Sequence, residues 1–159
     1  MSRRIGMLTA AVVLVVVACG DREQASPARR AEVAAKGAQV MPFDLDKTRH
    51  HFEDLPDGGL QTVTILDPAD SLNLRLIGEH LALEAAKFSR GEFDDPMAIH
   101  GHAMPGLAEL RVAGDRIAVQ YAPQHDGGRI RYTTADPALV AALHRWFAAQ
   151  RSDHGTPPR

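Results

Sequence analysis

Two stretches of the chain have the pattern of an amphipathic helix. The first runs from 68 to about 90, and the second from 137 to about 154. The positions of their apolar stripes are Leu74, Ile77, Leu81, Ala85 and Phe88 in the first stretch and Leu139, Leu143, Trp146, Phe147 and Gln150 in the second. Because these positions recur with the period of an α-helix, we expect each helix to bury one face.

Four shorter segments rich in apolar and β-branched residues predict strands. They lie at 48–54, 60–66, 116–122 and 129–134. An Asp-Gly-Gly motif separates the strands of each pair, at Asp57-Gly58-Gly59 and again at Asp126-Gly127-Gly128. Glycine adopts positive φ at little cost, so both motifs predict hairpin turns.

Each predicted hairpin is followed by the motif Asp-Pro-Ala, at 67–69 and at 136–138, so both motifs recur after 69 residues. The aspartate can cap a helix, and proline is well tolerated at the first helical position. A strand-strand-helix unit is therefore expected twice. The predicted fold is α+β: a duplicated ββα unit that forms a four-stranded antiparallel sheet with two helices on one face.

We expect this fold to occupy a single domain at 43–155, followed by a short tail at 156–159. An inter-unit loop at 91–114 joins the two units. Within this loop, Asp94 and Asp95 precede a proline and are interpreted as the polar start of a helical turn. A short helix is expected between Pro105 and Ala113.

The N-terminus has the pattern of a bacterial lipoprotein signal peptide at 1–18. Arg3 and Arg4 form a cationic start, and an uncharged, mostly apolar run follows from Ile5 to Ala18. This run is shorter than the ~20 apolar residues of a spanning helix. The sequence Val16-Val17-Ala18-Cys19 resembles a lipobox, which predicts cleavage before Cys19 and attachment of lipid to it.

The residues after the cysteine, 19–42, are polar and rich in alanine, and no sustained apolar stripe runs through them. This composition predicts a flexible tether. The expected location is therefore the cell envelope, with the domain outside the cytoplasm and held on a membrane through lipid at Cys19.

Composition narrows the chemistry that such a domain can perform. Hydrophobic residues make up 45% of the chain and charged residues 24%, which is typical of a globular protein. The formal net charge is −2, with acidic and basic residues intermixed, so we expect no nucleic-acid partner. The single cysteine excludes an internal disulfide and, once lipidated, thiolate chemistry.

Eight histidines direct attention to metal binding. The strongest local motif is His100-Gly101-His102-Ala103-Met104, whose imidazole and thioether donors suit copper, especially Cu(I). His80 and Glu84 are four residues apart on the first predicted helix, a spacing that can supply two ligands to one ion. The full set of candidate ligands, with copper preferred to zinc, is His50, His80, Glu84, His100, His102 and Met104.

Simpler interpretations exist for each of these features. A His-x-His-x-Met string in a glycine-containing loop can arise by chance, and His80 with Glu84 can be an ordinary surface pair. His154, near the end of the second helix, is expected to be a protonated capping residue favoured by the helix dipole. Ser89 and Ser152 lack the context of an activated nucleophile, so no catalytic residue is predicted.

Several segments resemble a family of small bacterial proteins without an established function, some of whose members carry an aspartate carbamoyltransferase label. The resemblance covers about residues 42–155. It rests on Phe43-Asp44-Leu45-Asp46, Gly58-Gly59-Leu60-Gln61-Thr62-Val63, Ala98-Ile99-His100-Gly101, Met104-Pro105-Gly106-Leu107, Tyr132-Thr133-Thr134-Ala135-Asp136-Pro137 and Ser152-Asp153-His154-Gly155. It implies the domain boundary and no particular activity. Carbamoyltransferase activity is not expected, because the chain lacks a second domain and a Ser-Thr-Arg-Thr phosphate-binding motif.

These observations lead to one functional hypothesis and two alternatives. The hypothesis is a membrane-anchored envelope lipoprotein whose non-enzymatic domain binds a transition metal. The first alternative is a metal-free module that docks an envelope protein through the exposed sheet face or the loop at 91–114. The second is small-molecule binding or an enzymatic activity between the helices and this loop.

Overall fold

The computed structural model of the protein describes residues 24–154. Its helices are α1 (Pro27–Val40), α2 (Ser71–Phe88), α3 (Asp94–His100), α4 (Leu107–Arg111) and α5 (Pro137–His154), with short 3-10 turns at η1 (Leu45–Lys47) and η2 (Gly114–Arg116). Its strands are β1 (Thr48–Leu55), β2 (Gly58–Ile65), β3 (Ala118–Gln124) and β4 (Gly127–Thr133). The predicted signal peptide, Cys19 and the tail at 156–159 lie outside the described residues.

The four strands form one antiparallel sheet in the order β1-β2-β4-β3. β1 pairs with β2 and β3 with β4 as hairpins, while β2 and β4 pair at the centre, where Gln61 lies opposite Ile130. The predicted α+β class is therefore confirmed. The strand-strand-helix order also occurs twice, as β1-β2-α2 and β3-β4-α5.

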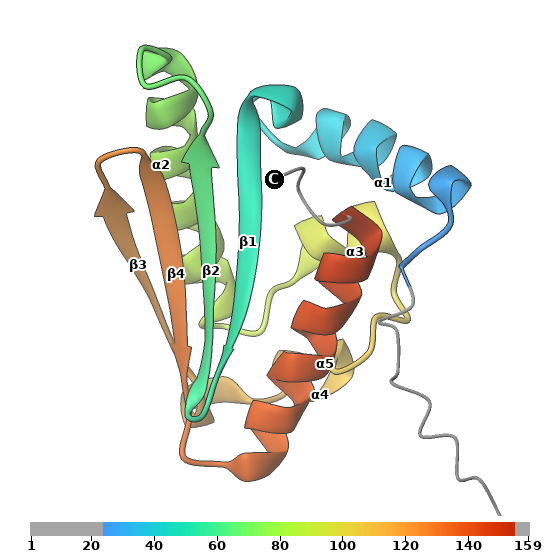
Figure 1. The fold of residues 1–159 in the computed structure, drawn as a ribbon. Helices are drawn as coiled ribbons and strands as arrows, with labels where there is room; N and C mark the ends of the chain where they lie inside the picture. Colours follow the sequence, from blue (N-terminus) through green and yellow to red (C-terminus); the bar gives the residue numbers. More distant parts are fainter. Residues whose placement is uncertain (1–23, 155–159) are drawn as a thin grey trace, which may run out of the picture.

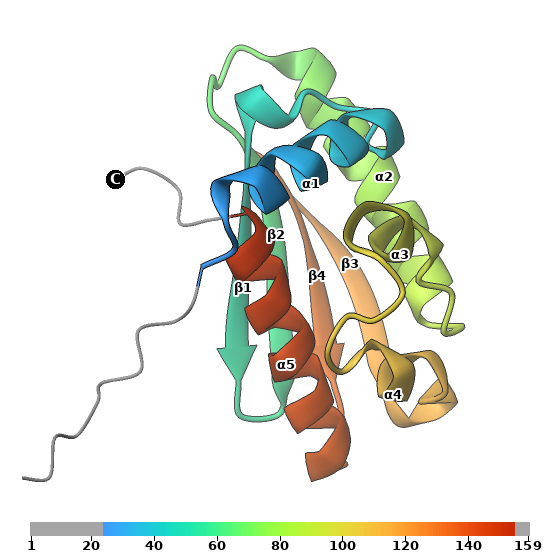
Figure 2. The same cartoon turned by 90° about the vertical axis from the view of Figure 1, so that its right-hand side faces the viewer.

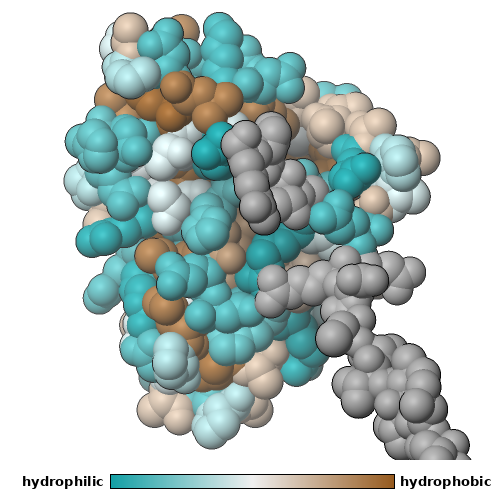
Figure 3. Space-filling model, viewed as in Figure 1, coloured by the Kyte–Doolittle hydropathy of each residue, from teal (hydrophilic) through white to brown (hydrophobic). Residues whose placement is uncertain are grey.

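One face of the sheet is apolar and the other is polar. Phe52, Val63, Ile130 and Tyr132 alternate with outward residues along their strands and are all buried. This period of two is what a sheet covered on one side requires. On the face shown in Figure 3, hydrophilic residues predominate and apolar residues form scattered patches.

The helices lie on the apolar side of the sheet, as Figures 1 and 2 show. Each long helix packs mainly on the hairpin of the other strand-strand-helix unit, an arrangement that we call crossed placement. α2 packs mainly on β3 and β4, whereas α5 packs on β1 and β2. Close approach of helix to sheet depends on glycine. A Cβ at Gly59 would overlap the ring of Phe147 on α5, and one at Gly128 would lie 2.9 Å from the ring of Tyr121 and 3.1 Å from Leu81 on α2.

The two long helices begin differently, although each follows an Asp-Pro-Ala motif. α5 starts at Pro137 as predicted, and the Asp136 carboxylate accepts a hydrogen bond from the Ala138 N–H at 2.9 Å. α2 starts later than predicted, at Ser71, where Asp70 accepts from the Asn73 N–H at 3.0 Å. In α2 the N-cap is therefore Asp70, and not the aspartate of the Asp-Pro-Ala motif.

The segment expected to be a flexible tether contains a helix instead. α1 lies within it, begins after Ser26, whose side chain accepts from the Arg29 N–H, and packs on α3 and α5. Val33 is only 1% exposed, and Gly37 is buried where a Cβ would lie 2.9 Å from Leu45. Val33 and Gly37 are the buried residues of α1, and neither produces an apolar stripe in the sequence.

The inter-unit loop contains α3 and α4, so the expected partial order is present. α4 is shorter than the helix expected between Pro105 and Ala113 and packs on α5. α3 ends at His100, because Gly101 has a φ of 93° that turns the chain away from the helix. None of the helices within residues 24–154 has the length and hydropathy needed to span a bilayer.

Candidate functional site

A small cavity lies between the apolar face of the sheet and the helices that cover it. Its volume is about 40 Å³, enough for a water molecule or an ion. The cavity is lined by aromatic rings and by an unusual number of polar side chains. We call five of them the histidine pocket: His50 from β1, His80 and Glu84 from α2, His100 from α3 and His154 from α5.

Two residues of α2 and one of α3 form the tightest group of donors in this region. His80 and Glu84, one helical turn apart, are 8% and 3% exposed. Asp95 joins them from the first turn of α3, and one donor atom from each of the three residues lies within 4.8 Å of the others. Among the described residues, this is the one group of His, Cys, Asp or Glu with donors that close.

A lysine ammonium already lies between the two carboxylates. Lys87 Nζ is 3.0 Å from Glu84 Oε1 and 3.2 Å from Asp95 Oδ2. Lys87 therefore joins two ion pairs, one with Glu84 and one with Asp95. The Glu84 side chain is nearly inaccessible to solvent, whereas that of Lys87 is partly exposed. A metal ion bound here would have to replace the ammonium as the counter-charge.

Burial sets the protonation of this group. Desolvation raises the pKa of Glu84 to about 7, against the opposing hydrogen bond from Lys87. Desolvation also lowers the pKa of His80, so its imidazole is neutral at neutral pH and keeps a free lone pair. The His80 ring makes no hydrogen bond to any described residue, although it is more than nine-tenths buried.

At the other end of the histidine pocket, three imidazoles come together. The His50 and His154 rings have centroids 5.4 Å apart and are nearly parallel, at 12°. The His100 ring meets that of His154 edge-on, with centroids 5.0 Å apart. Phe43 contacts both ends, since its ring lies 5.9 Å from that of His50 and 5.7 Å from that of His80.

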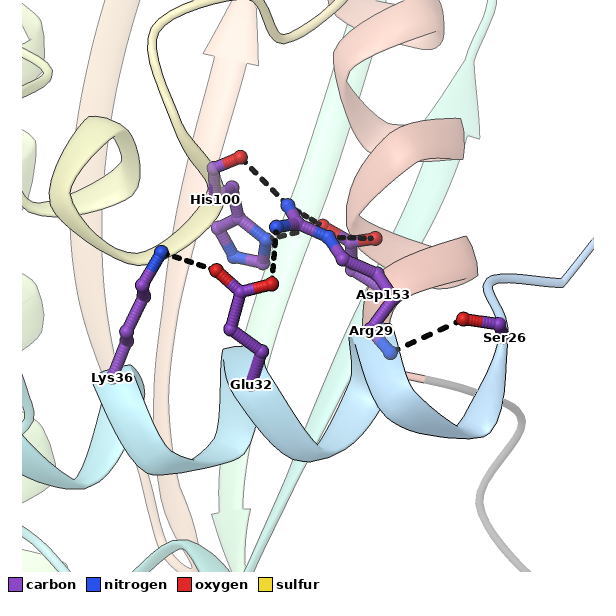
Figure 4. Close-up of polar contacts among 6 residues, drawn as sticks. All are labelled: Ser26, Arg29, Glu32, Lys36, His100 and Asp153. Carbon is purple, nitrogen blue, oxygen red and sulfur yellow. Dashed lines mark hydrogen bonds and ion pairs between the residues drawn. The ribbon is translucent and has the colours of Figure 1, made fainter.

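A carboxylate and a guanidinium fix the orientation of His100 (Figure 4). Asp153 Oδ2 lies 2.8 Å from His100 Nδ1, and Arg29 binds the same carboxylate with Nε at 3.3 Å and Nη2 at 2.9 Å. Arg29 Nη2 also donates to the His100 carbonyl at 2.6 Å. Because an ionised carboxylate only accepts, Nδ1 carries the proton and Nε2 keeps the lone pair.

The pKa values of these groups follow from burial and from their neighbours. Desolvation lowers the pKa of His50 to about 3, and the nearby His154 adds to this effect. Although His154 is exposed as a residue at the end of α5, its ring packs against its neighbours, and desolvation lowers its pKa to about 4. Burial lowers the pKa of His100 despite the opposing contact with Asp153.

The predicted six-residue ligand set is assembled only in part. His50, His80, Glu84 and His100 line the same cavity. His102 is exposed, and Met104 is buried in the apolar core; both border a separate outer groove beside Gly101. The turn at Gly101 takes His102 and Met104 out of the histidine pocket, while His100 borders both the pocket and the outer groove.

Three residues of this region were not predicted to take part. Asp95 lies in the first turn of α3, which agrees with the predicted start of a helical turn. Its carboxylate also lies close to the donor atoms of His80 and Glu84 on α2. His154 was expected to be a protonated cap, whereas burial of its ring favours the neutral form. Asp153 gave no signal, since its role depends on His100 from a distant helix.

Comparison with known proteins does not supply a function. No family model, curated protein or solved structure matches the chain. The geometry of the histidine pocket is therefore the basis for proposing a function.

Proposed function

We propose that this protein is a lipid-anchored envelope protein whose domain binds a divalent transition metal, with zinc as the preferred ion, through His80, Glu84 and Asp95. The observation that carries the proposal is the convergence of their donor atoms within 4.8 Å in a largely buried site. Without a metal, the largely buried His80 ring has no hydrogen-bond partner among the described residues. With a metal, its lone pair has a partner.

The donor set favours zinc at this position. One imidazole and two carboxylates are ligands that zinc accepts at about 2.0–2.2 Å, in a tetrahedral arrangement whose fourth position a water can fill. Cu(I) prefers softer, neutral donors, whereas two of the three donors in this group are carboxylates. The earlier preference for copper depended on Met104, which belongs to the core cluster.

The size of the cavity supports a binding role in preference to catalysis. Small-molecule sites are usually about 300–1,000 Å³ in volume. The histidine pocket encloses about 40 Å³, which suits an ion and its water. Glu84 and His80 are therefore assigned as ligands and not as an acid–base pair for an organic substrate.

Zinc titration of the Cys19→Ser chain tests the metal site, since this change removes the one thiol that could compete. We expect one equivalent to bind at micromolar concentration or tighter. His80→Gln is expected to weaken binding at least tenfold, because it removes one of three ligands. Glu79→Gln, which alters an exposed carboxylate of the same helix paired with Arg75, should bind zinc like the parent.

Two outcomes contradict the zinc proposal. One is the absence of binding at micromolar zinc by a folded parent chain. The other is an affinity unchanged by His80→Gln, which would place the ion elsewhere.

Support for the lipid anchor comes from the sequence around Cys19, and the fold adds a consequence. The Ala25 N–H donates to the Ser152 carbonyl at 3.3 Å, so the chain is in contact with the domain at a position six residues after Cys19. Six residues reach about 20 Å at most. The lipidated protein would therefore hold the α1 end of the domain close to the membrane surface.

Metabolic labelling with a fatty-acid analogue tests the anchor. The full-length protein, made in a bacterium that processes lipoproteins, is expected to take up the label and to sediment with membranes. Cys19→Ser is expected to lose both properties, whereas Ser26→Ala should keep them. Label retained by Cys19→Ser, or a wild-type protein found free of membranes, contradicts the anchor.

A further inference from the structure

A second group of potential ligands lies at the far end of the histidine pocket from Asp95. His50, His100 and His154 come from a strand and two helices that are far apart in the sequence. Their ring centroids are separated by 5.4 Å between His50 and His154 and by 5.0 Å between His100 and His154. Imidazoles that share one ion at about 2 Å from each nitrogen place their centroids at about this separation.

One of the three rings is already oriented as a ligand. The Asp153 carboxylate holds His100 Nδ1 at 2.8 Å and is itself fixed by Arg29. The lone pair of His100 is therefore on Nε2. A carboxylate behind a metal-bound histidine is the usual means of fixing its tautomer and ring orientation.

The other two rings have unused nitrogens. Within residues 24–154, neither His50 nor His154 makes a side-chain hydrogen bond, and their ring contacts are with each other and with aromatic neighbours. Phe43 packs on His50, and Phe52 lies 6.3 Å from His154 in a stacked arrangement. These rings surround the imidazoles with apolar surface.

The donors of this group differ in kind from those around Glu84. Three imidazoles pack together, with the His154 ring parallel to that of His50 and edge-on to that of His100. The nearest carboxylate, Asp153, is engaged by Arg29 and by His100 Nδ1. Neutral imidazole suits copper. Because none of these three ligands carries a negative charge, a monovalent ion leaves the smaller net charge buried in the pocket. The ring of Phe43 contacts one imidazole at each end of the pocket, His50 at one end and His80 at the other.

We propose that His50, His100 and His154 form a second metal site, for Cu(I), that is separate from the zinc site proposed at His80, Glu84 and Asp95. The His50 and His154 rings are nearly parallel, so one must rotate about its Cβ–Cγ bond to aim a nitrogen at the ion. His154 makes this rotation, because it is the outermost of the three and stands at the end of α5.

Cu(I) titration of the Cys19→Ser chain, under reducing and oxygen-free conditions against a chromophoric chelator, measures this site. We expect one equivalent of Cu(I), with X-ray absorption showing only nitrogen neighbours, at about 2 Å. His154→Gln and His100→Gln are each expected to weaken Cu(I) binding at least tenfold. His51→Gln and His102→Gln are matched controls, because they change exposed histidines within two residues of His50 and His100. Both variants should bind Cu(I) like the parent.

Zinc titration of the same variants separates this inference from the zinc proposal. His154→Gln, the variant least involved in the core, should retain zinc binding, and Glu84→Gln should retain Cu(I) binding. If His154→Gln loses both ions, the pocket is one site and the second-site inference is overturned while the metal-binding function stands. A sulfur neighbour in the absorption spectrum, or Cu(I) affinity unchanged by both histidine variants, also overturns it.

Discussion

Acidification from pH 6.5 to 4.5 is expected to lower the unfolding free energy of a Glu84→Gln variant by about 2 kcal/mol more than that of the wild type. The pKa of His50 is lowered to about 3 in the folded protein from an ordinary 6.5. The unfolded chain therefore binds more protons below pH 6.5, and stability is lost as the pH falls through this window. The lowered pKa values of His154, His80 and His100 act in the same direction.

Glu84 opposes this effect in the wild type. Its folded pKa is raised to about 7 from an ordinary 4.5, so the folded protein binds more protons between these values. Its contribution to stability is therefore present at low pH and lost as the pH rises through the window. Replacing Glu84 removes the compensation and leaves the histidine effect.

Urea unfolding at several pH values between 4.5 and 7.5, without metal, measures both effects. His50→Gln in the wild-type background is expected to make acidification to pH 4.5 less destabilising than it is in the wild type, because one of the lowered histidine pKa values is removed. His51→Gln, on the opposite face of the same strand, should follow the wild type. A Glu84→Gln profile that is flat down to pH 4.5 would show that the histidines are not desolvated as the structure indicates.

Replacement of Lys87 by methionine is expected to lower stability and raise zinc affinity together. Without the ammonium, Glu84 and Asp95 lose their shared counter-charge, and the cost should be about 2 kcal/mol, below that of a fully buried pair because Lys87 is partly exposed. Zinc no longer competes with an internal cation, so its affinity should rise at least tenfold. Saturating zinc should then restore the lost stability, since a ligand stabilises the state that binds it.

Thermal unfolding with and without zinc, together with a zinc titration, tests this expectation. The control is Arg75→Met, which breaks the exposed pair with Glu79 on the same helix and should alter neither property appreciably. Weaker zinc binding by Lys87→Met would mean that the lysine supports the site and does not compete with the ion.

Much of the fold could be predicted because its signals are local. The Asp-Gly-Gly hairpins and the apolar stripes depend on residues within one turn or one helix, and both are found in the structure. Docking of α1 could not be predicted, since Val33 and Gly37 become informative only when α3 and α5 lie beneath them. The late start of α2 depends on competition between two neighbouring aspartates.

The site follows the same rule. His80 and Glu84 could be paired from their spacing on one helix, which fixes their relative position. Asp95 and His154 could not, because only the packing of α3 and α5 brings them to the pocket. His102 lies outside the pocket because a single glycine at 101 changes the chain direction, and the sequence motif does not indicate which way the chain turns.

The crossed placement of the long helices has a consequence for how the chain acquires its structure. β1, β2 and α2 are complete when residue 88 has been synthesised, but the helix that shields their strands, α5, begins only at residue 137. Until then α2 covers only part of the apolar side of the first hairpin, through β2, and it lacks β3 and β4, on which it mainly packs. We infer that β1, β2 and α2 do not form a stable folding intermediate by themselves. Folding is then one cooperative transition that requires α5 to be present.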